Sequence, residues 1–139
     1  MKSRINVGVV GCGYWGPNLI RNFRALPTCR LKVMCDLNEG RLAHLHALYP
    51  EIERETDFAR LIADPELHAI VISTAVPLHF PMAQRALLAG KHVLIEKPMA
   101  MTETECDDIL ALEEKSGINY MVAFRCRFAR GAIDVKREI

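Results

Sequence analysis

At 139 residues the chain has the length of a single domain, and half of its residues are apolar while a quarter are charged, a balance typical of globular proteins. The formal net charge of +1 provides no broad positive field for nucleic acid or an anionic membrane, and no apolar run reaches the ~20 residues that span a bilayer. The five cysteines are odd in number and form no CxxC pair, which predicts reduced thiols and a cytoplasmic protein. Nucleic-acid and membrane partners are therefore not expected.

Short β-branched runs alternate along the chain with segments of helical period. The runs are predicted as strands buried on both faces of a parallel sheet, and they cover residues 5–10, 31–35, 69–74, 92–96 and 119–124. The segments between them are predicted as helices that begin at Gly16, cover about 39–49 and 57–63, run from Leu78 or His79 to Gly90, and run from Thr102 to Gly117. This order predicts an α/β fold: one domain with a doubly wound, mainly parallel Rossmann sheet and helices on both faces.

Two of these helices carry clear end signals. Pro81 lacks an amide hydrogen and fits only in a first helical turn, so the fourth helix is predicted to begin just before it. The fifth helix opens with Thr102 and Glu105, which have the spacing of a capping box. It ends before Gly117, a residue type that favours the C-cap.

A glycine motif joins the first predicted strand to the first predicted helix. Gly11, Gly13 and Gly16, in the segment VVGCGYWGPN, have the spacing GxGxxG. In this context the motif favours a loop for a dinucleotide pyrophosphate: the first glycine permits a tight turn, the second lets the backbone approach the phosphates, and the third allows close packing of helix on strand. The helix N-terminus adds unpaired N–H groups and the positive end of the helix dipole.

Asp36 follows the second predicted strand, at the distance from the glycines that a ribose-binding acid has in dinucleotide-binding domains. Its carboxylate is placed to accept hydrogen bonds from the adenosine ribose and to repel a 2′-phosphate, which favours NAD over NADP as cofactor. Two points stay open. Asp36 can instead cap the next helix through the segment DLN, and Arg41, one helical turn further on, can soften the discrimination against a phosphate.

Together with the glycine loop, the segment VPLHFPMAQRALLAGKHVLIEKPMA (76–100) resembles the glucose-fructose oxidoreductase, inositol dehydrogenase and MocA family of nicotinamide-dependent oxidoreductases. The resemblance covers about residues 4–124, and the segment GCGYWGPNLIRNF is most similar to members that act on nucleotide-linked sugars, such as the UDP-N-acetylglucosamine 3-dehydrogenases. It implies a Rossmann domain that binds a nicotinamide dinucleotide and a sugar or nucleotide-sugar substrate.

The resemblance also implies roles for individual residues. Glu96, Lys97 and Pro98 match the EKP motif of the family, in which the lysine lies beside the nicotinamide and the lysine–proline bond is often cis. Lys97 is the implied catalytic residue, because its ammonium can hydrogen-bond the substrate hydroxyl and stabilise a developing alkoxide. The further cofactor-binding positions that the match implies are Tyr14, Trp15, Ser73, Thr74 and His79.

Each implied residue also has a structural interpretation. Lys97 can be a solvated lysine at a strand end, although the carboxyl ends of parallel strands are where open α/β sheets bind ligands. His79 can be a packed histidine at a helix start, and Tyr14 and Trp15 can cover the sheet edge. These alternatives stay open at the level of sequence.

No metal site is predicted. His44 and His46 are close in sequence, but they lie two residues apart on a predicted helix and therefore point to different sides of it.

The chain departs from the family pattern at its carboxyl end. Family members are usually more than twice this long, and their second domain supplies the substrate cradle and commonly the oligomer interface. We therefore expect residues 1–124 to form the dinucleotide-binding domain and residues 125–139 to be a helical extension that starts the missing substrate domain. The last eight residues keep Ala132, Val135 and Ile139 on one helical stripe, from which we expect a homo-oligomer or a partner chain.

Local departures accompany this difference in length. Ala75 stands where the family usually has a proline, and Ala129 and Arg130 replace an asparagine–proline pair. Arg127 and Phe128 can still match the family pattern, but they are not assigned a catalytic role.

Three functions are compatible with the sequence. The favoured one is the NAD(P)-binding domain of an oxidoreductase that transfers hydride between a sugar or nucleotide-sugar secondary alcohol and a nicotinamide, inactive or incomplete by itself. A non-catalytic NAD-binding or scaffold module would carry the same glycine loop. A Rossmann-like protein that binds S-adenosylmethionine also uses a glycine loop and an acid after the second strand, but the EKP segment argues against it.

Overall fold

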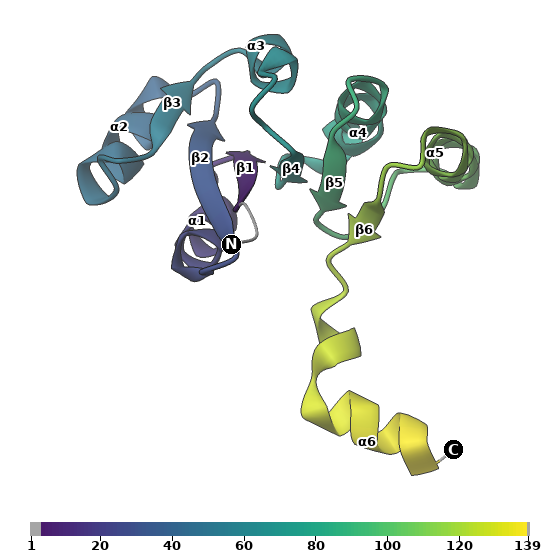
Figure 1. The fold of residues 1–139 in the computed structure, drawn as a ribbon. Coiled ribbons are helices and arrows are strands. Elements are labelled where there is room, and N and C mark those ends of the chain that lie inside the picture. Colours follow the sequence, from purple (N-terminus) through teal and green to yellow (C-terminus); the bar gives the residue numbers. More distant parts are fainter. Residues whose placement is uncertain (1–3, 139) are drawn as a thin grey trace.

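A computed structural model describes residues 4–138 as a sheet of six parallel strands in the order β3-β2-β1-β4-β5-β6 (Figure 1). The strands are β1 (Ile5–Val10), β2 (Cys29–Cys35), β3 (Glu53–Glu55), β4 (Ala69–Ile72), β5 (His92–Ile95) and β6 (Tyr120–Val122). Strand order reverses between β1 and β4, which is the usual position of a ligand crevice in an open α/β sheet. The predicted doubly wound parallel sheet is confirmed.

Helices cover both faces of this sheet, as predicted. They are α1 (Gly16–Ala25), α2 (Glu39–Leu48), α3 (Phe58–Ala63), α4 (His79–Leu88), α5 (Glu103–Ser116) and α6 (Arg130–Glu138), with short 3₁₀ turns η1 (Val76–Leu78) and η2 (Arg125–Phe128). The apolar side chains of α1 and α2 pack on one face, and those of α3, α4 and α5 pack on the other. Within residues 4–138, no helix combines the length and the apolarity that a bilayer crossing requires.

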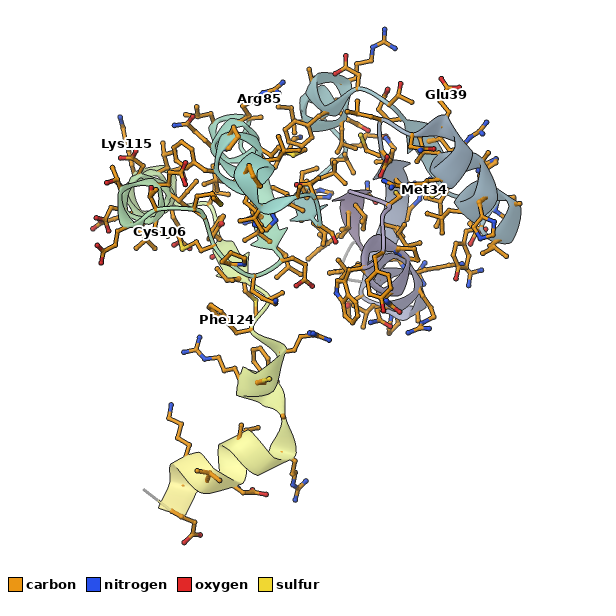
Figure 2. All side chains as sticks on the ribbon, turned by 180° about the vertical axis from the view of Figure 1, so that it is seen from behind. Met34, Glu39, Arg85, Cys106, Lys115 and Phe124 are labelled. Atoms are coloured by element: carbon orange, nitrogen blue, oxygen red, sulfur yellow. The ribbon has the colours of Figure 1, made fainter. Side chains whose placement is uncertain are left out.

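The side chains of the central strands alternate between the two halves of the core. On β4, Ile70 and Ile72 lie in the cluster under α3, α4 and α5, whereas Val71 lies in the cluster under α1 and α2. Met34 of β2 is fully buried in the second cluster, and Figure 2 shows it between the strands and their covering helices. Burial on both faces explains why these strands read as continuous apolar runs.

The strands differ from the sequence prediction at several of their limits, and one strand was not predicted. β3 was missed because its sequence, Glu-Arg-Glu, has no apolar pattern; it is an edge strand that pairs only with β2. β2 begins at Cys29 rather than residue 31, and β6 is confined to Tyr120–Val122. β4 ends at Ile72, so Ser73 and Thr74 belong to the loop that follows it.

The predicted helix ends are confirmed. The Thr102 hydroxyl accepts a hydrogen bond from the Glu105 amide at 3.2 Å, and the Glu105 carboxylate accepts one from the Thr102 amide at 3.2 Å. Gly117 ends α5 in the left-handed conformation, with φ 68°. Pro81 lies in the first turn of α4, which begins at His79.

The carboxyl-terminal segment leaves the sheet after β6. Helix α6 lies away from the sheet and packs on η2 (Figure 1), and Figure 2 shows Phe124 where the chain departs. Of the predicted stripe, Ala132 and Val135 are exposed, and Ile139 lies outside the described residues. On the sheet face that α1 and α2 cover elsewhere, Met121 of β6 is 47% exposed.

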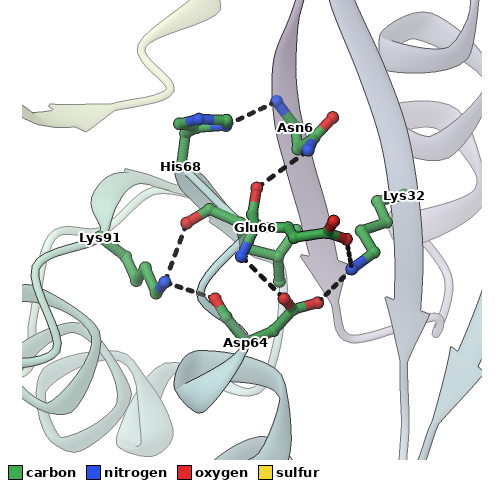
Figure 3. Close-up of polar contacts among 7 residues, drawn as sticks. Asn6, Lys32, Asp64, Glu66, His68 and Lys91 are labelled. Atoms are coloured by element: carbon green, nitrogen blue, oxygen red, sulfur yellow. Dashed lines mark hydrogen bonds and ion pairs between the residues drawn. The ribbon is translucent and has the colours of Figure 1, made fainter.

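A network around the buried lysines Lys32 and Lys91 lies at the opposite edge of the sheet from the carboxyl ends of the strands (Figure 3). The Lys32 ammonium contacts the carboxylates of Asp64 and Glu66, each at 2.6 Å. The Lys91 ammonium donates to the backbone carbonyls of Asp64 and Leu67 at 2.6 and 2.9 Å. These contacts fix the connection between α3 and β4. They lie away from the carboxyl ends of the strands, where the ligand crevice of an open α/β sheet is found.

Candidate functional site

A cleft of about 1050 Å³ opens at the carboxyl edge of the sheet, where strand order reverses. It is lined by the segments that follow β1, β2, β3, β4 and β5, and by one residue after β6. Of the residues singled out in the sequence, the cleft brings together Gly11, Gly13, Tyr14, Trp15, Asp36, Arg41, Ser73, Thr74, His79, Glu96 and Lys97. Gly16 and Pro98 do not line it.

The three glycines of the loop have different surroundings. Gly11 has φ 91°, and a Cβ there would lie 2.4 Å from the Ser73 carbonyl oxygen. A Cβ on Gly16 would lie 2.0 Å from the carbonyl oxygen of Gly11. Gly13 is different, because the nearest atom to an added Cβ is Nη1 of Arg41 at 3.8 Å. Gly11 and Gly16 therefore allow the loop to fold, whereas Gly13 leaves space in the cleft.

The Asp36 carboxylate ties the glycine loop to the end of β2. One of its oxygens accepts a hydrogen bond from the Cys12 amide at 2.7 Å, and the other accepts one from the Asn38 amide at 2.8 Å. The guanidinium of Arg41 lies 3.6 Å from the first oxygen. Each carboxylate oxygen has a second lone pair, so the group can still accept hydrogen bonds from a ligand in the cleft.

Asn38, and not Asp36, caps helix α2. The N-cap residue of α2 is Asn38, whose side chain accepts a hydrogen bond from the Arg41 amide at 3.0 Å. Asp36 is therefore not required to cap the helix, and its side chain, which is 10% exposed, faces the glycine loop.

His79 connects the two loops on either side of the cleft. Its Nδ1 lies 2.7 Å from the carbonyl oxygen of Pro98, and its Nε2 lies 3.1 Å from that of Thr74. The side chain is almost fully buried. The sequence left open whether this histidine is packed or faces a ligand, and the geometry makes it a positioning residue that fixes the segments carrying Thr74 and Lys97.

Lys97 lines the cleft at the end of β5. The residue is exposed, and within residues 4–138 its side chain makes no hydrogen bond or ion pair. The Lys97–Pro98 peptide is cis, as the resemblance implied. The preceding Glu96 is half-buried, and one of its carboxylate oxygens is buried without a hydrogen-bond partner among the described residues.

One end of the cleft, beside β2 and β3, contains apolar and aromatic side chains that the sequence analysis did not identify. The Arg85 guanidinium lies 5.1 Å from the centroid of the Phe58 ring, and Leu37, which also lines the cleft, is 88% exposed. Thr56 and Met82 line the cleft as well. These residues belong to no sequence motif. Leu37 is the exception in one respect, because its position directly after Asp36 could have indicated that it lines the cleft.

The other end of the cleft contains Trp15, which the sequence predicted as a cofactor-binding residue, and Arg125, which it did not predict. The Arg125 guanidinium lies 4.3 Å from the centroid of the half-buried Trp15 ring. Tyr14 is 97% exposed and therefore does not cover the sheet edge. Arg127 and Phe128, two and three residues further on, do not line the cleft.

The thiols near the glycine loop are not set up for nucleophilic chemistry. Burial raises the pKa of Cys12 and that of Cys35 to about 12 each, so both are thiols near neutral pH. All five cysteines are free, as predicted. The described part of the chain contains no cluster of three or more metal-ligating side chains.

Comparison with known proteins agrees with this geometry. Residues 5–124 match the family described as "Oxidoreductase family, NAD-binding Rossmann fold", of the glucose-fructose oxidoreductase, inositol dehydrogenase and MocA type. The chain belongs to this family. Inositol 2-dehydrogenase 2 of Saccharopolyspora erythraea is 34% identical over 137 residues, which are 97% of this chain and 40% of that relative.

Solved structures of the family have the same fold. An NAD-binding oxidoreductase from Klebsiella pneumoniae superimposes with a TM-score of 0.85 at 29% identity, over 97% of this chain and 38% of that one. A 3-ketoreductase from Actinomadura kijaniata, in complex with NADP and TDP-benzene, superimposes with a TM-score of 0.89 at 22% identity, over 98% and 43%. The chain thus spans about two fifths of the length of these relatives and corresponds to their nucleotide-binding domain.

Proposed function

We propose that this NAD(P)-binding domain serves an oxidoreductase that transfers hydride between a secondary alcohol of a sugar or nucleotide sugar and a nicotinamide cofactor. One observation carries the proposal. A single cleft at the switch point of the sheet holds a glycine loop with space at Gly13, an acid at the end of β2, and an unpaired lysine at the end of β5. Family membership and the inositol 2-dehydrogenases among the relatives support it.

The residues of the cleft fit a dinucleotide. Gly13 is the position where a side chain would fill the cleft rather than meet the backbone, and the N-terminus of α1 supplies amide donors and a positive dipole beside it. Asp36 keeps acceptor capacity for ribose hydroxyls. The nicotinamide, when bound, accepts or donates the hydride.

Lys97 is the residue that we assign to the substrate oxygen. Its ammonium has no partner among residues 4–138 and the residue lines the cleft, so it can donate a hydrogen bond to the substrate hydroxyl and stabilise negative charge on that oxygen. His79 fixes its loop through the Pro98 carbonyl. Hydride transfer also needs the substrate held in a site without water, and this open cleft does not supply that. The chain by itself is therefore expected to bind cofactor with little or no turnover.

NAD is the proposed cofactor in preference to NADP. The carboxylate of Asp36 would repel a 2′-phosphate. Arg41 lies 3.6 Å from that carboxylate and partly balances its charge, so the preference is expected to be moderate rather than absolute.

Thermal unfolding with added ligand tests the proposal. A ligand at 100 times its dissociation constant stabilises the folded chain by about 2.7 kcal/mol, so NADH should raise Tm clearly and NADPH should raise it less. S-adenosylmethionine at the same concentration should have no effect. A shift with S-adenosylmethionine and none with NADH would overturn the assignment.

A turnover assay separates the oxidoreductase from a non-catalytic module. With NAD and nucleotide sugars, the chain supplemented with the remainder of a family member should reduce NAD, and Lys97→Ala should abolish the reaction. Cofactor binding without turnover in that complemented assay would favour the scaffold function.

We also propose that a second copy or a partner chain covers the exposed sheet face at Met121, and that the protein works in the cytoplasm.

A further inference from the structure

Arg125 occupies a defined position at the end of the cleft beside β5 and β6. It lies three residues after the end of β6, at the start of the turn η2, and β6 is the neighbour of β5, at whose end Lys97 lies; both residues line the cleft. Asp36 follows β2, and β1 and β4 lie between β2 and β5. Arg125 is therefore on the side of the cleft where Lys97 meets the substrate, not at the ribose acid.

The guanidinium of Arg125 is held by stacking and keeps its hydrogen bonds free. Its carbon lies 4.3 Å from the centroid of the Trp15 ring, a contact that orients a planar cation. Within residues 4–138, no carboxylate lies within ion-pair distance of Arg125, and its side chain donates no hydrogen bond. A guanidinium has five N–H donors in a fixed fork, which matches a carboxylate or a phosphate.

The charges at this end of the cleft favour an anion that also carries hydroxyls. Lys97 and Arg125 line the cleft as two cations, and Glu96 is the one carboxylate on that side of it. One oxygen of Glu96 and the indole nitrogen of Trp15 are buried side-chain atoms for which the described residues provide no partner. A buried polar atom without a partner is uncommon in a folded protein and is consistent with an added acceptor and donor for ligand hydroxyls.

We propose that Arg125, oriented by Trp15, is a specificity residue that binds an oxyanion of the substrate, so that the substrate is an acidic sugar rather than a neutral one. The oxyanion is a carboxylate of the sugar or a phosphate attached to it. This inference rests on the proposed function, since it assigns the substrate class to the same cleft. The stacked pair of Trp15 and Arg125 is the observation that carries it.

Trp15 is the only tryptophan in the chain, so its fluorescence reports directly on Arg125. The full chain, saturated with NAD, is titrated with glucuronate, with glucose 6-phosphate and with glucose, and Trp15 emission is followed. Glucuronate or glucose 6-phosphate should change the emission saturably, and the more effective of the two identifies the anionic group. Glucose should bind at least about tenfold more weakly, a difference of about 1.4 kcal/mol.

Three variants make the test specific. Arg125→Gln should lose at least about tenfold in affinity for the acidic sugar, and Arg125→Lys, which keeps the charge without the fork, should lose part of it. Arg127→Gln is the matched control, because it removes one positive charge from the same turn at a residue that does not line the cleft. It should bind the acidic sugar like the wild-type chain.

The outcomes separate this inference from the proposed function. Equal responses to glucose and the acidic sugars, no response to any of them, or equal losses in the Arg125 and Arg127 variants would each overturn it. A loss of NADH affinity in Arg125→Gln as large as the loss for the acidic sugar would make Arg125 a cofactor ligand and also overturn it. Absence of NADH binding in the wild-type chain would instead refute the proposed function itself.

Discussion

The three glycines of the loop meet two different requirements: one is the folding of the loop, and the other is space for a ligand. Gly11 and Gly16 lie against backbone carbonyl oxygens, so a side chain at either position collides with the loop itself. Gly13 has no such neighbour, and its side of the loop faces the cleft. Gly11 and Gly16 are therefore required for the loop to fold, and we propose that Gly13 is required for the ligand to bind.

Substitutions at Gly13 and Gly16 should have opposite consequences. Gly13→Val should leave Tm nearly unchanged but abolish NADH binding, because the side chain takes the space left for the phosphates. Gly16→Ala should destabilise the chain by on the order of 3 kcal/mol, because its Cβ cannot fit 2.0 Å from the Gly11 carbonyl oxygen. Thermal unfolding and NADH titration measure both effects. Retained binding in a folded Gly13→Val chain would place the phosphates elsewhere.

Asp36 should control the choice between the two nicotinamide cofactors. Asp36→Ala should weaken NADH binding by about tenfold or more, since hydrogen bonds to a charged group contribute about 1.5–3 kcal/mol. Its affinity for NADPH should fall less, because the repulsion of the 2′-phosphate is also removed. The ratio of the two dissociation constants is the informative quantity, since loosening of the loop at the Cys12 amide affects both ligands alike. An unchanged ratio would remove Asp36 from the ribose site.

Among the elements, the connection from α3 to β4 depends on charges at the edge of the sheet opposite the cleft (Figure 3). The hydrogen bond from Lys32 lowers the pKa of Asp64, and the hydrogen bonds to Asp64 and Glu66 raise the pKa of Lys32. Lys32 is buried, with 9% of its side chain exposed. An unpaired charge there would be costly, so the pair is needed once Lys32 is buried.

The stability from this pair should depend on pH with a defined sign. Because the pKa of Asp64 is below its ordinary value of 3.8, its contribution is present above pH 3.8 and is lost as pH falls through the folded-state pKa. The pKa of Lys32 is above 10.5, so its contribution is present below pH 10.5 and is lost as pH rises through the folded-state value. The pair therefore stabilises the fold across the neutral range.

Asp64→Asn tests this dependence. Asparagine keeps an oxygen for the Glu66 amide, which Asp64 bonds at 2.9 Å, but it loses the charge. The variant should be about 1–3 kcal/mol less stable than the wild-type chain at pH 7. The difference should shrink as the pH is lowered below 3.8 toward the folded-state pKa of Asp64, because protonation removes the charge that distinguishes Asp64 from asparagine. Urea unfolding at pH 7 and at pH 3 measures it, and a difference that grows at pH 3 would contradict the pairing.

At the scale of the whole molecule, the sheet and its five covering helices form the folded unit, and α6 lies outside it (Figure 1). Removing residues 129–139 should therefore change Tm by less than about 2 °C, which corresponds to about 0.5 kcal/mol for a domain of this size. The NADH affinity should also be unchanged, because none of these residues lines the cleft. A large fall in Tm would show that α6 contributes to the domain.

The sequence by itself determined the alternation of strands and helices apart from β3, the parallel sheet and many of the residues that line the cleft. These features depend on signals within a few residues: apolar runs, the capping box at Thr102, the spacing of the glycines and the EKP segment. The polar edge strand β3 has no such signal, because a strand that pairs on one side only can be exposed and charged.

Only the tertiary structure decided what the side chains do in the cleft. Asn38 caps helix α2, and Asp36 accepts a hydrogen bond from the Cys12 amide of the glycine loop. His79 is buried between two carbonyl oxygens, and the Arg125 guanidinium stacks on the Trp15 ring. The contacts of Asp36 with the Cys12 amide, of His79 with the Pro98 carbonyl and of Arg125 with Trp15 join segments that are distant in the sequence, and the sheet order brings these segments to one edge. The physical reason is that a local pattern specifies which face of an element is apolar, whereas a hydrogen bond or a stacked cation depends on where another element ends.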